Sequence, residues 1–392
     1  MIEHFFASCP RGLENLLAQE LIRIGASSAE ETAGGVLFSG AWPLVYRANL
    51  ESRLASRILW RVATGAYRNE HDIYALAYDI DWSQHFTEKR TLRIDLTATD
   101  SPLTSLAFAT LRIKDAICDR FRAQDKPRPS IDKHHPDVRV FAYLTDNEAT
   151  FYLDTSGEAL FKRGYRKHSE QAPLRENLAA GLLTLSGWRP ATTLLDPFCG
   201  SGTIAIEAAL IAANTAPGLN RAFAFQKLNH YDGPAWQREK QKARDAIRPH
   251  TGDTMIFAGD HAAAAGERAQ HYAQEASVAD RIKFNVQDAN TWQAPNTQGI
   301  WLCNPPYGHR LEDQQSLARL YPLLGTTLKQ QFAGWHAWFF TADKQLPKGL
   351  GLKPERRIPL FNGALDCRLY GFKMIQGAMR RIKDQSSTVE DR

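Results

Sequence analysis

The sequence predicts an α/β fold in which a doubly wound C-terminal domain follows a mixed α+β region. From about residue 173 onward, short apolar runs alternate with helical patterns, which is typical of βαβ units and a parallel sheet. Between residues 41 and 154, strand-like runs outnumber two helical patterns, which indicates an α+β arrangement. The length of 392 residues favours two or three domains.

The composition excludes several classes of protein. With 43% hydrophobic and 23% charged residues, the chain has enough apolar material for a sizeable core and is not a disordered protein. No run approaches the roughly 18 apolar residues of a membrane span, and the segment before Leu17 lacks the apolar centre of a signal peptide. The five cysteines form no Cys-x-x-Cys pair, so we expect no disulfide framework, no metal site and a cytoplasmic location.

Residues 1–44 predict a small strand–helix–strand unit. A strand at His4–Ala7 is followed by a turn and by a helix at Leu13–Ile24, where the leucines recur at helical spacing. Gly25 suits the helix C-terminus, and Val36–Phe38 is the second strand. The unit is too small to be stable alone.

The region from about Ala41 to Asp154 has the pattern of an α+β domain. A helical pattern at Pro43–Ala55 opens it, and Leu92–Leu96 alternates apolar and polar residues as a half-buried strand does. Leu106–Phe121 is a second helix. Val138–Leu144 and Ala149–Leu153 are two strands separated by a hairpin-like turn.

This second region is rich in cations. Between Lys89 and Arg139 there are eleven Lys and Arg residues against seven Asp residues, an excess that is over half of the net charge of +5. Arg112, Lys114 and Arg120 on the predicted helix are candidate RNA contacts, and an ordinary solvated face is equally compatible with the pattern.

The connection at Leu160–Arg175 resembles a linker. Arg163 and Arg166 flank the aromatic Tyr165, and cations beside an aromatic ring suit phosphate contacts combined with base stacking. We therefore include Arg163 and Arg166 among the candidate RNA contacts. A plain interdomain linker is the alternative interpretation.

Residues 161–380 predict the doubly wound domain, and residues 381–392 a polar tail. The expected helix at Ile204–Ala213 follows a turn that contains two glycines. The expected strands are Thr193–Leu195, Met255–Ala258, Ile282–Val286, Ile300–Cys303, Trp338–Thr341 and Leu369–Met374.

The turn before that helix is a candidate cofactor site. It consists of Asp196, Pro197, Phe198, Cys199, Gly200, Ser201, Gly202 and Thr203. The two glycines permit a tight turn and a close backbone approach to a ligand at the strand end, where doubly wound sheets bind cofactors. Ala205 replaces the third glycine of the dinucleotide pattern, which some dinucleotide sites accept, and the lack of Gly-Lys-Thr excludes a P-loop. The leading Asp196 disfavours a pyrophosphate and favours a cationic group such as an amine or a sulfonium.

Two further acids follow the next predicted strands. Asp260 can accept both hydroxyls of a ribose, and Asp288 can accept an adenine amine. Each alone is more often a helix cap or a loop charge, but their positions after successive strands, behind the Asp196 turn, favour one shared site.

Asn304, Pro305, Pro306 and Tyr307 follow the fourth of these strands. The prolines stiffen the turn, so that the Asn304 side-chain carbonyl and the Pro305 backbone carbonyl are two convergent acceptors. Such acceptors pull a weakly nucleophilic exocyclic amine towards pyramidal geometry without a strong base, and Tyr307 can stack on a base. In isolation an ordinary proline turn would be the better interpretation.

Together, Asp196–Gly202 and Asn304–Tyr307 resemble the amino-methylating branch of the Rossmann-like methyltransferases. The chain as a whole resembles the bacterial 23S rRNA guanine-N2 methyltransferase family in its single-methyltransferase form. The further motifs are Phe6–Ser8, Arg11–Glu14, Gly34–Val36, Ser52–Arg57, Arg163–Arg166, Ala216–Leu219 and Asn362–Cys367.

The resemblance implies a ferredoxin-like segment over 1–44, a THUMP RNA-binding domain over 45–160 and a Rossmann-like methyltransferase domain over 161–380. It implies S-adenosylmethionine as cofactor, with Asp196 and its glycines at the methionine end, Asp260 at the ribose, Asp288 at the adenine and Glu176 on the helix that closes over it. Asn304 and the rest of its turn then form the catalytic target-amine site.

The resemblance also implies ribosomal RNA as partner, with neither metal nor membrane, and a single methylation reaction because the chain ends at Arg392. Two alternatives remain open. One is an adenine-N6 methyltransferase acting on DNA or RNA, since the Asn304 turn does not distinguish the amines. The other is an RNA-binding ribosome-assembly factor with a vestigial cofactor pocket.

Overall fold

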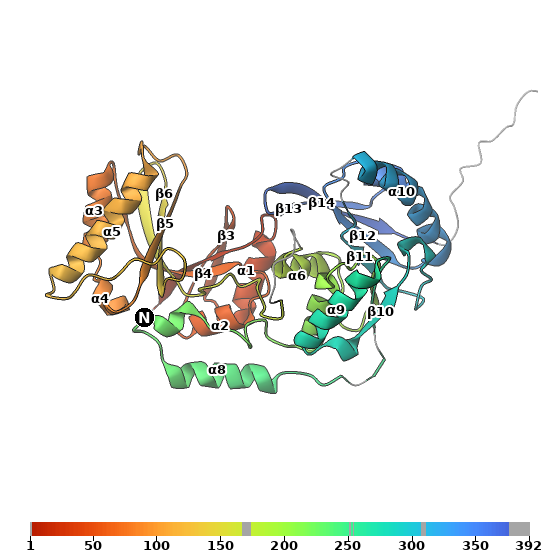
Figure 1. Ribbon diagram of the computed structural model, residues 1–392, viewed down its shortest axis with the longest axis horizontal. Coiled ribbons are helices and arrows are strands. Elements are labelled where there is room, and N and C mark those ends of the chain that lie inside the picture. Colours follow the sequence, from red (N-terminus) through yellow and green to blue (C-terminus); the bar gives the residue numbers. More distant parts are fainter. Residues whose placement is uncertain (1, 167–173, 251, 254, 307–310, 376–392) are drawn as a thin grey trace, which may run out of the picture.

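The computed structural model describes residues 2–166, 174–250, 252–253, 255–306 and 311–375, so Tyr307 and the tail over 381–392 lie outside the described residues. Within these ranges the chain forms two seven-stranded sheets, one in each half of the elongated molecule (Figure 1). Helices pack on both sheets. The two halves meet along α1, α2 and α6, near the middle of Figure 1.

The first sheet has the strand order β2-β3-β1-β4-β7-β6-β5, and its only parallel pair is β5 with β6. β4 pairs with both β1 and β7, so the sheet runs without a break through the predicted boundary at residue 44. Its strands are β1 (Glu3–Ser8), β2 (Ser28–Thr32), β3 (Gly35–Gly40), β4 (Arg57–Ala66), β5 (Leu92–Ala98), β6 (Val138–Leu144) and β7 (Glu148–Asp154). Its helices are α1 (Glu14–Ile24), α2 (Leu44–Glu51), α3 (Glu70–Asp79), α4 (Trp82–His85) and α5 (Leu106–Arg122).

The strands and helices predicted in this half are confirmed, apart from the length of the Pro43–Ala55 helix, which ends at Glu51. Ser52 is extended there, and its side chain donates to the buried Glu20. The elements that were not predicted include β2, α3 and the four-residue helix α4. β2 is almost fully polar and exposed at the edge of the sheet, and α3 buries only two residues, so neither has a strong apolar period.

The second sheet has the order β10-β9-β8-β11-β12-β14-β13, with β8 to β12 parallel and β14 antiparallel to both of its neighbours. Its strands are β8 (Leu194–Asp196), β9 (Ile256–Asp260), β10 (Ile282–Val286), β11 (Ile300–Cys303), β12 (His336–Thr341), β13 (Arg356–Asn362) and β14 (Leu365–Lys373). Its helices are α6 (Glu176–Leu185), α7 (Thr203–Ala212), α8 (Gly233–Asp245), α9 (Ala263–Glu275), α10 (Leu311–Gln331) and α11 (Leu346–Leu350). The doubly wound prediction is confirmed, and β13 is the strand that it missed.

The strand order of this sheet places a switch point between β8 and β11. The chain winds outward from β8 through β9 to β10 and then returns to the other side of β8 as β11. Connections leave the two central strands in opposite directions, which opens a crevice at their carboxyl ends. Both sequence motifs lie at these strand ends, since Asp196 ends β8 and Asn304 follows β11.

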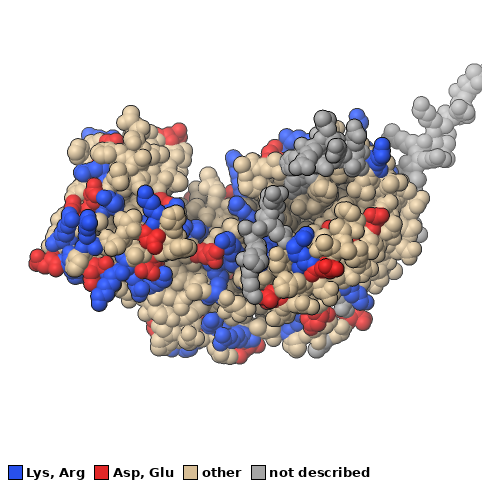
Figure 2. Space-filling model, viewed as in Figure 1, with Lys and Arg blue, Asp and Glu red and all other residues tan. Residues whose placement is uncertain are grey.

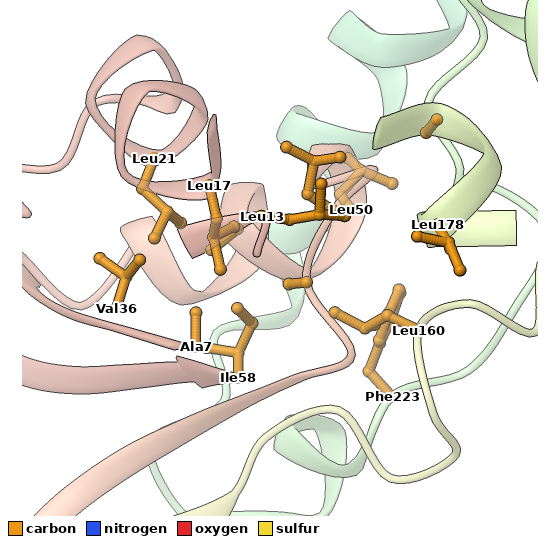
Figure 3. Packing of buried hydrophobic residues seen from close by; sticks show 14 of the residues in the cluster. Ala7, Leu13, Leu17, Leu21, Val36, Leu50, Ile58, Leu160, Leu178 and Phe223 are labelled. Atoms are coloured by element: carbon orange, nitrogen blue, oxygen red, sulfur yellow. The ribbon is translucent and has the colours of Figure 1, made fainter. Parts of the chain in front are cut away.

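One hydrophobic core extends through both halves. Leu13, Leu17 and Leu21 of the α1 region and Leu178 of α6 belong to the same buried cluster (Figure 3). The halves approach closely, because a Cβ on Gly181 of α6 would lie 2.5 Å from a Leu13 methyl carbon. A second, smaller core lies between α10 and the strands β11 and β12.

The connection between the halves is packed, and the burial of Arg163 speaks against its predicted contact with RNA. Its side chain is only 2% exposed, and its Nε lies 3.1 Å from a carboxylate oxygen of Glu207 on α7. The same guanidinium donates to the backbone carbonyls of Leu160 and Arg53. A buried and fully engaged guanidinium cannot reach a phosphate, and Arg163 instead ties both halves to the connection.

No helix among the described residues is long and apolar enough to cross a membrane.

Candidate functional site

The turn after β8 has the shape that its glycines predict. Gly200 and Gly202 have φ angles of +53° and +78°, a region that side chains other than glycine rarely adopt. The Gly202 N–H donates to the Cys199 carbonyl over 2.7 Å and so closes the turn. A Cβ on Gly202 would lie 3.0 Å from the Cβ of Ala269 on α9, so the glycine also lets α9 approach.

Asp196 is a buried acid at the start of this turn. Asp196 is 1% exposed, and burial raises the pKa of its carboxyl from 3.8 to about 8. Among the described residues, the hydrogen bond to this carboxyl comes from the Phe198 N–H, over 3.3 Å. The negative charge of nearby Asp260 adds to the rise. A cationic group beside Asp196 would offset the cost of ionising it.

Asp260, at the end of β9, is joined to the same turn. One of its carboxylate oxygens accepts from the Gly200 N–H over 3.1 Å, and the other accepts from the Ala262 N–H over 3.0 Å. Asp288 lies at the next strand end and is exposed, just before a single helical turn at Ala289–Thr291. The three acids therefore follow successive strands, as the sequence predicted.

Arg166 faces this turn, an orientation that speaks against its predicted contact with RNA. Its side chain is 12% exposed, and one guanidinium nitrogen lies 3.1 Å from a carboxylate oxygen of Glu176. The guanidinium also donates to the hydroxyls of Ser201 and Thr203. Glu176 begins α6, and burial raises the pKa of its carboxyl. Arg166 and Glu176 thus join the interdomain connection and α6 to the start of α7.

A cavity of about 210 Å³ lies above the turn. The predicted site residues that line it are Asp196, Phe198, Cys199, Gly200, Ser201, Thr203 and Asn304. Leu174, Ile204 and Arg268 complete the lining, and the sequence analysis did not single them out. Arg268 comes from α9, where no motif marks it, so only the fold brings this cation to the cavity.

Other predicted site residues lie beside this lining. Pro197 and Gly202 shape the turn, while Glu176 and Asp260 contact it through Arg166 and Gly200. Asp288 is the most distant of the acids in chain and sheet order, one strand beyond Asp260.

The turn after β11 brings Asn304 to the cavity. Asn304 is partly buried, Pro305 is buried and Pro306 is exposed. Burial raises the pKa of the thiols of Cys199, within the first motif, and Cys303, just before the second, so both thiols stay protonated at neutral pH. The site therefore offers carboxyl, amide and guanidinium groups to a ligand, and its cysteines are not thiolate nucleophiles.

The remaining candidate RNA contacts lie on α5. The Arg112 guanidinium is 4.3 Å from the centre of the Tyr74 ring, and that of Arg120 is 5.7 Å from the Tyr78 ring. Lys114 is one-third exposed and lies 2.6 Å from a carboxylate oxygen of Asp115. On the face drawn in Figure 2, Lys and Arg side chains are spread over this half and along the middle of the molecule. No group of three or more His, Cys, Asp or Glu side chains that could hold a metal ion occurs among the described residues.

Three family models match successive parts of the chain. The model described as "RMKL-like, methyltransferase domain" matches residues 163–371, which is about half of the chain. A THUMP domain model matches residues 67–154, and a model described as "RlmL ferredoxin-like domain" matches residues 4–59.

Curated and solved relatives agree with these matches. The chain is 40% identical to a ribosomal RNA large subunit methyltransferase K/L from Shewanella baltica, over 96% of this chain and 54% of that protein, so it spans about half of that relative's length. The structure of SMU.472 complexed with SAH is 28% identical, with a TM-score of 0.87 over 96% of this chain and 99% of the other. A predicted N6-adenine-specific DNA methylase from Listeria monocytogenes is also 28% identical, with a TM-score of 0.87 over 95% and 97% of the two chains.

Proposed function

Because the chain belongs to the RMKL-like methyltransferase family, we propose that it transfers a methyl group from S-adenosylmethionine to the exocyclic N2 of a guanine in 23S ribosomal RNA. The observation that carries this proposal is that Asp196 and Asn304, from different motifs, line one cavity at the switch point of the second sheet. A cation-binding acid and an amine-polarising amide are the two groups that such a transfer requires.

The residues around the cavity fit the amino-acid end of this cofactor. Its ammonium group would stabilise the ionised form of the buried Asp196, and Arg268 would meet its carboxylate. A Cβ on Gly200 would meet no described atom within 4 Å, so the turn leaves open space there. Since small-molecule pockets usually measure about 300–1,000 Å³, we expect the adenosine end to extend beyond the cavity, past Asp260 towards Asp288.

When bound, S-adenosylmethionine supplies an electrophilic methyl group from its sulfonium. The Asn304 side-chain carbonyl and the Pro305 backbone carbonyl would accept hydrogen bonds from the target amine and orient its lone pair towards that methyl group. An amide is not a base at neutral pH, so Asn304 would act by orientation and polarisation and not by removing a proton first.

The first sheet would supply RNA affinity and placement. The THUMP match over residues 67–154 and the surface cations of α5 support this role, and so does the ribosomal RNA named for the Shewanella relative. A ribosomal RNA substrate also makes the cytoplasm the place of action that we propose.

A second candidate function is adenine-N6 methylation, which the name of the Listeria relative favours. The two candidates differ in the atom that accepts the methyl group. Inosine in place of the target guanine removes the N2 amine and should abolish methylation, whereas purine in place of a target adenine removes the N6 amine.

The direct test is to incubate the purified chain and S-adenosylmethionine with ribosomal RNA from a strain that lacks this protein, and then to identify the methylated nucleoside by mass spectrometry. N2-methylguanosine is the expected product. N6-methyladenosine would replace the proposed substrate atom by the alternative one, and an absence of any methylated nucleoside in RNA would contradict the proposed function.

A further inference from the structure

The β13–β14 hairpin ends at the same edge of the second sheet as Asn304. In the sheet register, Cys303 of β11 is opposite Phe339 of β12, and Phe339 is opposite Tyr370 of β14. Arg368 lies two residues further towards the carboxyl ends of β11 and β12, opposite Thr341. Adjacent strands are about 4.8 Å apart, so the Arg368 backbone lies about 10 Å from the path of the turn that follows β11.

Three cations gather at this end of the hairpin. Arg368 forms an ion pair with Asp366, whose other carboxylate oxygen lies 3.3 Å from the Nζ of Lys344, in the loop after β12. The Arg11 guanidinium lies 4.8 Å from the centre of the Phe361 ring, and Phe361 pairs with Asp366 across the hairpin. We call Arg11, Lys344 and Arg368 the hairpin rim.

The rim has more positive than negative charge near its surface. Lys344 and Arg368 share the carboxylate of Asp366, which is 42% exposed, and Lys344 is 64% exposed. Arg11 lies over the Phe361 ring, and the nearby Glu14 carboxylate accepts from the Gly12 N–H, so the three cations are accompanied by two carboxylates. The neighbouring Asp343 carboxylate accepts hydrogen bonds from the Tyr321 hydroxyl and the Gln345 N–H, so it is engaged away from the rim.

Arg11 comes from the first half of the molecule. It lies in the turn before α1, and a Cβ on Gly12 would be 2.8 Å from the Pro359 carbonyl on β13. This close contact, which needs glycine at position 12, holds the N-terminal turn against the hairpin. The RNA-binding half and the methyltransferase half therefore both contribute charge to one rim beside the Asn304 turn.

We propose that the hairpin rim binds the phosphates of the RNA that flank the target nucleotide, an inference that rests on the proposed function. A base that enters the site must leave its stack, and its flanking phosphates then lie close to the turn that holds the amine. The rim is about one Debye length from that turn, which is near enough to attract and position these phosphates.

Stability does not explain the exposed part of the rim. An ion pair as exposed as Lys344–Asp366 contributes about 0–1 kcal/mol to folding. The motif Asn362–Cys367, which forms the hairpin turn, has no contact with the cofactor cavity among the described residues. Positioning of RNA gives this part of the chain a role that neither the core nor the cofactor requires.

The test compares Lys344→Ala and Arg11→Ala with Lys373→Ala in the full chain. Lys373 is an exposed lysine at the far end of β14, opposite His336 at the start of β12, so it is a matched control at the other edge of the sheet. The measurements are the Kd for a 23S rRNA fragment that wild type methylates, its dependence on salt, the Kd for S-adenosylmethionine and the melting temperature.

We expect each rim substitution to weaken RNA binding by about three- to tenfold and to reduce the slope of log K against log salt by about 0.7–0.9. Cofactor affinity should match wild type for both rim variants, and so should the melting temperature of Lys344→Ala. Arg11→Ala also loses its cation–π contact with Phe361, so its melting temperature should fall slightly. Lys373→Ala should match wild type in all four measurements. The rim proposal would be overturned if RNA affinity and salt slope were the same for Lys344→Ala, Arg11→Ala and Lys373→Ala. Methylation of ribosomal RNA by wild type would in that case leave the proposed function standing. If wild type neither binds nor methylates ribosomal RNA, both proposals fail.

Discussion

The two halves of the molecule differ in how far the charged side chains at their predicted binding sites are exposed. In the first half, Arg112 and Arg120 are partly exposed and hold their guanidinium groups over tyrosine rings on α3. In the second half, Asp196 and Glu176 are buried carboxyls whose pKa values are raised by burial. Partly exposed cations suit a large, strongly charged partner, whereas a buried acid suits a small cationic ligand that replaces water around it.

The connection between the two halves differs from both, since both partners of an ion pair are buried there. Arg163 and Glu207 are 2% and 0% exposed in their side chains. An ion pair at this depth gains little net stability over an apolar pair, but it fixes which surfaces meet. This buried Arg163–Glu207 ion pair therefore helps to hold the two sheets in one orientation.

The largest expected effect comes from breaking this ion pair. Arg163→Ala leaves Glu207 buried without its partner and should lower the free energy of unfolding by about 3–5 kcal/mol. The neighbouring Lys162→Ala is the matched control, because Lys162 and its partner Glu158 are 57% and 62% exposed, and it should change stability by less than about 1 kcal/mol. Denaturant unfolding of both variants measures the difference.

A double variant sharpens this test. Arg163→Met combined with Glu207→Leu removes both charges and should recover most of the loss, since an apolar pair of similar volume replaces the ion pair. If Arg163→Ala were as stable as Lys162→Ala, the buried ion pair would not be needed to hold the two halves together.

The next largest effect concerns the second sheet alone. Asn304→Ala removes one of the two acceptors for the target amine and should lower turnover by about 2.7–4 kcal/mol, if its loss resembles that of an oxyanion-hole donor. RNA affinity, which we propose the first sheet and the rim supply, should stay close to wild type. Single-turnover methylation and RNA binding, measured on one preparation, separate the effect on turnover from the effect on RNA affinity. A parallel loss of RNA binding would contradict the proposal that catalysis and RNA affinity come from different parts of the chain.

Asp196→Asn tests the buried acid through pH. In the folded chain the Asp196 carboxyl has a pKa of about 8, against 3.8 for its ordinary value, so the folded state keeps a proton that the unfolded state releases between these values. Stability should therefore be greatest at low pH for this group and fall as the pH rises from about 4 to about 8. Asp196→Asn should remove that component of the pH dependence.

The same acid should make cofactor binding depend on pH. An ammonium group favours ionised Asp196, so the affinity of wild type for S-adenosylmethionine should increase as the pH rises towards 8. Calorimetry across this range measures both the affinity and the proton released. Equal pH profiles for wild type and Asp196→Asn would show that another group controls binding.

The sequence predicted the second sheet and its turns well, because glycines and prolines are required there by backbone geometry. The Asp196–Thr203 turn has the predicted glycine conformations, and Asn304 reaches the same cavity. Arg268 was missed because a single arginine on a polar helix has no local signal, and only the packing of α9 against α7 brings it to the site.

The burial of Arg163 and Arg166, two predicted RNA contacts, has one physical cause that the sequence does not reveal. Arg163 and Arg166 lie in a polar run whose composition is typical of an exposed linker. Composition alone does not reveal that each forms an ion pair with a distant glutamate, Glu207 on α7 and Glu176 on α6 respectively. Arginine is common on surfaces and is buried mainly where it is paired, so its burial depends on residues that are distant in sequence. The roles of Arg112, Lys114 and Arg120 stay predictions.

The smallest expected effect concerns these α5 cations. Arg112→Gln should reduce the slope of log K for RNA against log salt by about 0.7–0.9, the value for one lost phosphate contact. Lys283→Gln is the matched control from the second sheet, since Lys283 is an exposed cation on β10 that also lies over an aromatic ring, Phe257, at 5.6 Å.

Both substitutions remove a cation–π contact, which is worth about 0.5–1 kcal/mol at exposed sites, so their effects on stability should be similar. Only Arg112→Gln should change the salt slope, because Lys283 on β10 lies outside both the first sheet and the hairpin rim, the two regions that we propose contact RNA. Binding titrations at several salt concentrations measure it. An equal change for Lys283→Gln would mean that cations contribute to RNA binding wherever they lie on the surface, and that the first sheet has no special part in it.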